Sequence, residues 1–190
     1  MKKERNIIFQ NLTRTENNFK KLKKKSYLEV IKKASTICIK ALQNGNKIMF
    51  CGNGGSAADA QHLSAELVGK YLKVRNPLYA LSLTTNTSTL TSISNDMSFE
   101  EIFSRQVKGF GKRGDVLFAI TTSVKSPNII HACKQAKKMG IKTILLTSVK
   151  SKKYNLDLTI NAPDTRVDRI QEMHIAIGHI ICELVEEKLG

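Results

Sequence analysis

The segment KIMFCGNGGSAADAQHLSAEL, which spans residues 47–67, decides the fold of this chain. Its first five residues, 47–51, are mostly apolar and predict a strand. The glycine-rich turn Gly52-Asn53-Gly54-Gly55-Ser56 follows directly, and residues from about 56 to 70 are expected to form a helix. The segment therefore predicts a strand that turns tightly into a helix.

The same alternation continues toward the C-terminus. Further strands are expected at 80–83, 116–120, 143–146 and 158–160, and further helices at about 98–110, 127–139 and 166–188. Upstream, residues from about 7 to 44 are expected to form two helices that separate near 24–26. Alternating strands and helices predict an α/β fold, with a parallel sheet covered by helices on both faces and a binding site at the carboxyl ends of the strands.

Length and composition favour one domain over residues 1–190. The chain is 41% hydrophobic, which is enough for a core, and it contains neither an internal repeat nor a linker. The four cysteines are scattered without a CxxC pair, the N-terminus does not resemble a signal peptide, and no apolar run is long enough to span a membrane. We therefore expect a cytoplasmic protein with free thiols and no membrane partner.

The formal net charge of +15 is the unusual feature of the composition. A basic surface attracts phosphates of any kind, so a nucleic-acid partner has to be considered. The lysines, however, gather at 20–25 and 150–153 without interleaved aromatic residues, and tryptophan is absent. We expect ordinary solvated lysine faces, and nucleic-acid binding is the least favoured reading.

Two loops are candidates for phosphate binding. In the first, 52–56, glycines let the backbone approach a ligand while Ser56 caps the following helix and, with the helix N-terminus, faces an anion. In the second, 121–126, four hydroxyls and Lys125 precede Pro127 at a helix start. Taken singly, the first is a tight turn and the second a hydroxyl-rich cap; two such loops at one sheet edge favour phosphate binding.

Four side chains on two predicted helices offer metal or acid–base chemistry. His62 and Glu66 are four residues apart and share a helix face, and Gln171 and His179 are eight apart and also share one. Nitrogen and oxygen donors of this kind suit a divalent metal, or an acid and a base. By spacing alone the signal is weak, because such residues on separate helices often have no joint role.

Four motifs together carry a family resemblance: CGNGGSAADAQHLSAELVGKY, SNDMSFEEIFSRQV, GDVLFAITTS and DRIQEMHIAIGH. They resemble the phosphoheptose isomerase branch of the SIS (sugar isomerase) family, in order, from about residue 45 to 186. The resemblance implies a three-layer αβα sandwich with a five-stranded parallel sheet, in which 1–44 are N-terminal oligomerisation helices and 45–190 the phosphosugar-binding core. It also implies a homotetramer with sites between subunits that converts sedoheptulose 7-phosphate to D-glycero-D-manno-heptose 7-phosphate for surface polysaccharide.

The resemblance also implies roles for individual residues. Glu66 matches the catalytic base and His179 its acid partner. One zinc ion per subunit is expected, with the ligands His62, Glu66, Gln171 and His179. The substrate-binding residues expected from the loops and the resemblance are Asn53, Gly54, Ser56, Asp96, Thr121, Thr122, Ser123, Ser126, Asp168 and Gln171.

The chain departs from the family pattern in three places. Val124 and Lys125 replace a glycine-containing stretch, and valine resists the positive φ that glycine permits, so a different loop shape is expected. Lys70 stands where the family commonly has an arginine, so the paired hydrogen bonds that a guanidinium group can donate are lost. The segment 148–153 replaces a glycine-rich one. A changed substrate or a lower activity therefore stays open.

Two other functions remain alternatives. One is a non-enzymatic SIS protein that binds the replication initiator DnaA, which the retained functional groups of Glu66 and His179 disfavour. The other is an isomerase or binder of another phosphosugar, which the altered loop at Val124 keeps open. A substrate panel separates these readings.

Overall fold

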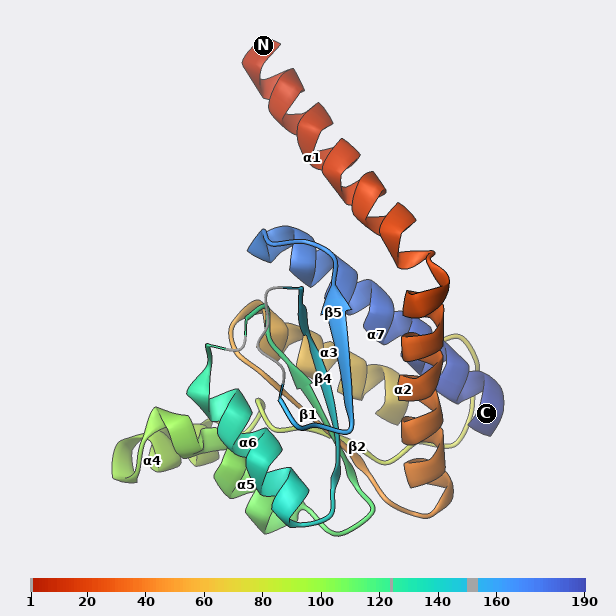
Figure 1. The fold of residues 1–190 in the computed structure, drawn as a ribbon. Helices are drawn as coiled ribbons and strands as arrows, with labels where there is room; N and C mark the ends of the chain where they lie inside the picture. The colour runs from red at the N-terminus through yellow and green to blue at the C-terminus, as the bar shows by residue number, and fades with distance from the viewer. Residues whose placement is uncertain (1, 124, 150–153) are drawn as a thin grey trace.

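The computed structural model describes residues 2–123, 125–149 and 154–190. Within them lies a five-stranded sheet, in which every pairing is parallel and the strand order is β2-β1-β3-β4-β5 (Figure 1). The strands are β1 (Ile48–Gly52), β2 (Ala80–Ser82), β3 (Val116–Ile120), β4 (Lys142–Ser148) and β5 (Leu158–Ala162). The expected five-stranded parallel sheet is confirmed, with each strand end within two residues of its prediction.

Helices cover both faces of the sheet (Figure 1). One face packs against α2 (Lys25–Gln43), α3 (Gly55–Val68) and α7 (Val167–Leu189), and the other against α4 (Thr87–Asp96), α5 (Ile102–Phe110) and α6 (Pro127–Lys138). Each face has its own apolar cluster, because strands buried on both sides send alternate side chains to opposite faces. The three-layer αβα sandwich is therefore confirmed.

The N-terminal helix α1 (Lys2–Leu22) projects away from the sheet (Figure 1). Its buried residues are Asn18 and Leu22, near its C-terminal end. Apolar side chains nearer the N-terminus are more than half exposed: Ile7, Ile8, Phe9 and Leu12. Two N-terminal helices were expected and are present, although the first begins at residue 2 rather than 7.

The strand order places a crevice beside the first glycine turn. The chain passes from β1 outward to β2 and then returns across β1 to β3, so the connections after β1 and β3 leave in opposite directions. Such a switch point is where parallel α/β sheets bind ligands. The register pairs Gly52 with Ile120, so the loops that follow these two residues start side by side.

One helix was not predicted. The segment 87–96, TSTLTSISND, consists largely of residues with low helix propensity, yet it forms α4. Asn86 caps this helix, because its side-chain oxygen accepts a hydrogen bond of 2.9 Å from the Thr89 amide. The helix expected over 98–110 instead begins with a 3₁₀ turn, Phe99–Glu101, before α5.

The four cysteines are free thiols, as their scattered positions predicted. All four are buried, and burial raises the pKa of Cys133 to about 12. Among the helices of the described ranges, none combines the length and apolar character that crossing a bilayer would require.

Candidate active site

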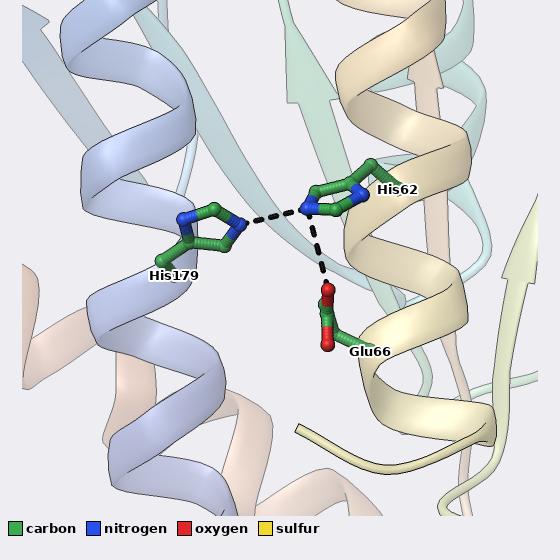
Figure 2. Close-up of side chains that lie close together, drawn as sticks. All are labelled: His62, Glu66 and His179. Carbon is green, nitrogen blue, oxygen red and sulfur yellow. Dashed lines mark hydrogen bonds and ion pairs between the residues drawn. The ribbon is translucent and has the colours of Figure 1, made fainter. Parts of the chain in front are cut away.

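His62, Glu66 and His179 lie together between α3 and α7 (Figure 2). The Nε2 atoms of the two histidines are 2.8 Å apart, and His62 Nε2 is 3.3 Å from Glu66 Oε1. One donor atom from each residue lies within 4.8 Å of the other two. Three of the four predicted metal-ligating side chains therefore lie in one cluster.

The cluster depends on a close approach of α3 and α7. Gly178, next to His179, faces Leu63, next to His62: a Cβ at Gly178 would stand 2.5 Å from Leu63 Cδ1. Only glycine fits at that separation without displacing Leu63. The absent side chain at position 178 thus lets the two helices bring their histidines into contact.

The donor set suits a divalent metal ion. Two imidazole nitrogens and one carboxylate oxygen are typical catalytic zinc ligands, and such sites leave a position open for substrate or water. The side chains of His62 and Glu66 are 48% and 19% exposed, so a ligand can reach them. The two imidazole nitrogens, 2.8 Å apart, form a hydrogen bond in which one donates and the other accepts.

Gln171, the fourth predicted ligand, lies over the glycine turn instead. A Cβ at Gly55 would stand 2.3 Å from Gln171 Nε2, so the amide fills the space above that glycine. Gln171 and His179 are eight residues apart on α7, which is about 12 Å along the helix axis. The structure therefore places Gln171 at the phosphate-binding candidate loop.

The glycine turn leads directly into α3. Gly54 has a φ of +54°, and a Cβ at Gly52 would stand 2.3 Å from the Ser56 carbonyl oxygen. The helix begins at Gly55, with Gly54 in the N-cap position, so the expected capping role of Ser56 is wrong. Ser56 is buried in the first turn instead.

Asn53 in this turn pairs with a residue that the sequence analysis missed. Asn53 and Asn128 exchange two amide hydrogen bonds, each 2.9 Å, and the buried Asn128 also accepts one from the Ile129 amide. Asn128 lies in the first turn of α6, so the pair joins the two candidate phosphate loops. Its position just after the 121–126 loop was the available signal.

The second loop combines buried and accessible hydroxyls. Thr121 is buried and donates a hydrogen bond of 2.6 Å to the Ser123 carbonyl oxygen. Ser123 is exposed, and Thr122 and Ser126 are partly buried at the entrance to α6. The prediction about Val124 lies outside the described residues, as does most of the segment 148–153.

A hollow of about 280 Å³ opens in front of the glycine turn. Its lining includes Asn53, Gly54, Thr84, Thr91, Ser94 and Phe99. Asp96, a predicted sugar-contacting residue, ends α4 and is exposed, where its carboxylate accepts a hydrogen bond of 2.9 Å from Asn95. Polar groups of the unpredicted helix α4 therefore border the candidate binding space.

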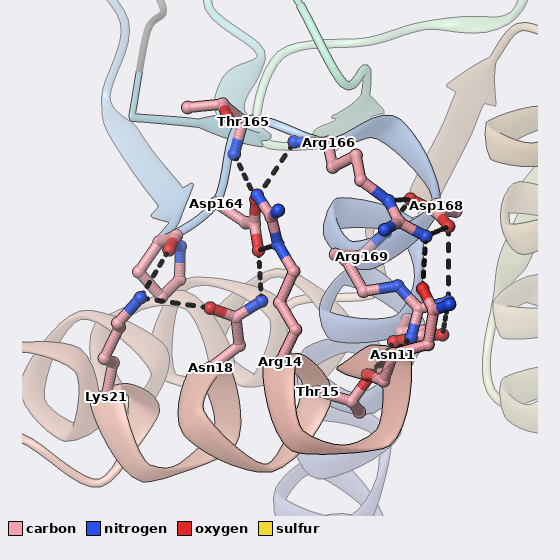
Figure 3. Close-up of polar contacts among 12 residues, drawn as sticks. Asn11, Arg14, Thr15, Asn18, Lys21, Asp164, Thr165, Arg166, Asp168 and Arg169 are labelled. Atoms are coloured by element: carbon pink, nitrogen blue, oxygen red, sulfur yellow. Dashed lines mark hydrogen bonds and ion pairs between the residues drawn. The ribbon is translucent and has the colours of Figure 1, made fainter. Parts of the chain in front are cut away.

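Asp168 lies in the first turn of α7 (Figure 3), about three turns before His179 on the same helix. Its carboxylate pairs with Arg166 at 2.5 Å and Arg169 at 3.2 Å, and the hydrogen bond from Arg166 holds its pKa well below the usual value. Both arginines also contact Asn11 of α1. Asp168 is thus tied to the contact between α1 and α7.

Two further residues near the cluster escaped sequence reasoning. Asp59 lies one turn before His62, and its Oδ2 atom is buried without a hydrogen-bond partner among the described residues. Burial raises its pKa to about 6, although nearby His62 lowers it. The ring of Tyr71 lies against His179, with centroids 5.7 Å apart. Only the folded chain brings Tyr71 to this place.

Comparison with known proteins agrees with this geometry. The chain matches the SIS domain family over residues 13–148. A phosphoheptose isomerase of Rhodospirillum rubrum is 52% identical to it over 161 residues, 84% of this chain and 86% of the relative. The chain belongs to the phosphoheptose isomerase family.

Solved structures of phosphoheptose isomerases have the same fold. The one from Neisseria gonorrhoeae matches with a TM-score of 0.89 and 37% identity, over 98% of this chain and all of that one. The one from Francisella tularensis matches with a TM-score of 0.92 and 29% identity, over 97% and 98% of the two chains. The fold shared with these phosphoheptose isomerases thus extends over nearly the whole chain.

Proposed function

We propose that this chain is a phosphoheptose isomerase that converts sedoheptulose 7-phosphate to D-glycero-D-manno-heptose 7-phosphate for heptose biosynthesis. The observation that carries the proposal is the cluster of His62, Glu66 and His179, which lies on the helix that starts at the glycine turn and on its neighbour. Membership of the phosphoheptose isomerase family supports the same substrate.

Aldose–ketose isomerisation moves a proton between two carbons. The Glu66 carboxylate removes a proton from C1 of the ketose while His179 donates one to the C2 carbonyl oxygen, which gives an enediol. The protonated Glu66 then returns its proton to C2. His179 takes the proton of the C1 hydroxyl, C1 becomes the aldehyde, and both side chains regain their starting states.

The two loops hold the phosphate in this proposal. The helices α3 and α6 begin directly after the glycine turn and after Ser126, so both direct the positive ends of their dipoles toward the crevice. Hydroxyls of Ser56, Thr122, Ser123 and Ser126 are the proposed hydrogen-bond donors, with Lys125 as a nearby charge.

We also propose that the cluster binds zinc through His62, Glu66 and His179, without Gln171, which lies over the glycine turn. When bound, the ion acts as a Lewis acid that polarises the substrate's carbonyl oxygen. The two roles of Glu66 compete, because a carboxylate on a metal is a weaker base, and the two roles of His179 compete as well, because an imidazole nitrogen bound to a metal carries no proton.

The proposed assembly is a cytoplasmic homotetramer of single-domain subunits with the N-terminal helices, residues 1–44, in the contacts. The exposed apolar residues of α1 support this role, because an isolated helix gains little from such side chains in water. Buried free thiols are consistent with a reducing compartment.

The test is to incubate the purified chain with sedoheptulose 7-phosphate, with and without zinc, and to follow the aldose phosphate by NMR. Glu66→Gln keeps the size of the side chain and removes the base, and Glu29→Gln changes an exposed glutamate on α2 as the matched control. Product that requires Glu66 and not Glu29 is expected. A folded chain that gives no product in either condition, or product with Glu66→Gln at the wild-type rate, contradicts the proposal.

A further inference from the structure

A buried carboxylate on α7 organises the loop that follows α3. Glu186 lies two turns beyond His179 on α7, and its side chain is 2% exposed. It accepts hydrogen bonds from three successive backbone amides, those of Tyr71 at 3.1 Å, Leu72 at 2.7 Å and Lys73 at 3.0 Å. Because three amides converge on one carboxylate, the loop has a fixed position relative to α7.

The positive partner of Glu186 closes the end of α3. Arg75 Nε lies 3.0 Å from Glu186 Oε1, and the Arg75 side chain is 3% exposed. The guanidinium donates to the carbonyl oxygens of Glu66 and Leu67, both at 2.8 Å. These carbonyls belong to the last turn of α3, where intrahelical donors are absent.

The pair therefore connects the two helices that carry the metal-ligand cluster. Arg75 donates a hydrogen bond to the backbone carbonyl of Glu66 on α3. Glu186 lies two turns from His179 on α7. Between them, the amide of Tyr71 is bonded to Glu186 while its ring lies against His179. Burial alone would raise the pKa of Glu186, but the three amides and Arg75 lower it overall, so the carboxylate is ionised.

A buried ion pair is a poor way to gain stability. The cost of removing two charges from water often equals or exceeds their attraction, and apolar residues of similar size commonly serve as well. What the pair supplies here is geometry: fixed donors and acceptors that set α3, the loop and α7 at one separation.

We infer that Arg75 and Glu186 are positioning residues of the active site, which hold Glu66, Tyr71 and His179 in the arrangement that binds the metal ion and the substrate. The inference rests on the proposed function. It concerns side chains that touch neither substrate nor metal and act through the backbone of Glu66 and the helix of His179.

The chain offers a matched control. Lys47 and Asp115 form a second buried ion pair, with Nζ and Oδ2 2.6 Å apart and the side chains 5% and 0% exposed. Asp115 likewise accepts backbone hydrogen bonds, from Lys47 and Lys112. This pair lies at the amino ends of β1 and β3, the opposite edge of the sheet from the crevice. If the loss of a buried ion pair were by itself the cause of an effect, variants of either pair would show that effect to the same extent.

The experiment compares Glu186→Gln with Asp115→Asn in the full-length chain. Cobalt(II) affinity is measured by chelator competition, and the imidazoles of the four histidines are observed by NMR after ¹³C labelling, without metal. We expect both variants to lose thermal stability. Only Glu186→Gln should weaken cobalt binding, by roughly ten- to a hundredfold, and shift the His179 resonance. It should also lower kcat more than it changes KM.

The outcomes that contradict the inference can be told apart from misfolding and from failure of the proposed function. Wild-type cobalt affinity and an unmoved His179 resonance in Glu186→Gln overturn the inference, as does an equal effect of Asp115→Asn. If Glu186→Gln does not fold, Arg75→Lys takes its place, because it keeps the charge but cannot span the two α3 carbonyls and Glu186. Failure of the proposed function would appear in the isomerase assay, as product formation without Glu66. The His179 resonance measured without metal would still test the positioning role in that case.

Discussion

The Nε2 atoms of His62 and His179 lie 2.8 Å apart, although 117 positions separate the two residues in the sequence. Each imidazole is held by a different helix, so the contact exists only where α3 and α7 pack closely. At this distance the two nitrogens form a hydrogen bond, in which one imidazole donates and the other accepts. The close packing of α3 and α7 is therefore what brings the donor atoms of the site together.

Removing one histidine of this pair should abolish metal binding and most of the activity. His179→Gln is expected to lower the isomerisation rate by roughly 10²- to 10⁴-fold, because the proposed acid and a metal ligand are lost together. Cobalt titration and the rate with sedoheptulose 7-phosphate check this. His131→Gln is the control, since His131 pairs with Glu101 at 2.9 Å on the opposite face of the sheet and should leave both measurements unchanged. A His179→Gln variant with wild-type cobalt affinity contradicts the prediction.

Alanine at two glycines of the turn should have very different effects. At Gly52 the added Cβ would stand 2.3 Å from the Ser56 carbonyl oxygen, so the turn must open and the protein should lose several kcal/mol of stability and its activity. At Gly54 no atom lies within 4 Å, and the cost is the backbone conformation alone, with φ +54° and ψ −122°, roughly 1–3 kcal/mol. Thermal unfolding and activity of the two variants measure the contrast. Equal destabilisation by both would show that the close approach at Gly52 does not matter.

The reciprocal amide pair predicts a graded series at position 128. Asn128→Ala leaves the amide of Asn53 without its partner and should raise KM, with a loss of stability of about 1–3 kcal/mol. Asn128→Asp keeps an acceptor for Asn53 and Ile129 but loses the donor, so an intermediate effect is expected. Asn155→Ala changes an exposed asparagine just before β5, at the opposite edge of the sheet, and serves as control. An Asn128→Ala variant with the KM of the wild type would contradict the substrate-binding role of Asn53.

The buried histidine of α7 predicts a pH dependence of stability. Burial lowers the pKa of His174 to about 4, although its hydrogen bond of 2.9 Å to the Thr147 carbonyl oxygen opposes this. Between about pH 6.5 and 4 the unfolded chain binds a proton that the folded chain does not, so stability falls as the pH falls, by at most roughly 3 kcal/mol, and this contribution is constant above pH 6.5.

Denaturant unfolding of wild type and His174→Gln over this range isolates the effect. Glutamine can still donate to the Thr147 carbonyl but cannot titrate. The difference in free energy of unfolding between the two proteins should therefore shrink, or reverse, as the pH falls from 6.5 to 4. A difference that is the same at both ends of the range shows that His174 does not titrate as proposed.

The sequence predicted the sheet well because its strands are buried on both faces. Runs such as 116–120 are continuously apolar, and that pattern is independent of what the run packs against. The helix α4 escaped prediction because its serines and threonines have low helix propensity, and its stability comes from the Asn86 cap and from packing through Ile93. Tertiary contacts outweigh propensity there.

In the candidate site, too, local relationships were predictable from the sequence and long-range contacts were not. The spacing of four placed His62 and Glu66 on one helix face, because that relationship is local. Their approach to His179 followed only from the family resemblance, and the position of Gln171 over Gly55 followed from neither. The pairing of Arg75 with Glu186 joins residues with no shared motif, so it needed coordinates.

The division of the cluster between α3 and α7 has a consequence for the synthesis of the chain. While the ribosome is still adding residues before position 179, the nascent polypeptide contains His62 and Glu66 but not the third donor. All five strands have been synthesised by then, since β5 ends at Ala162, yet a metal ion would find only two of the three clustered donor side chains. The complete donor set therefore cannot form until the last helix has emerged and folded against α3.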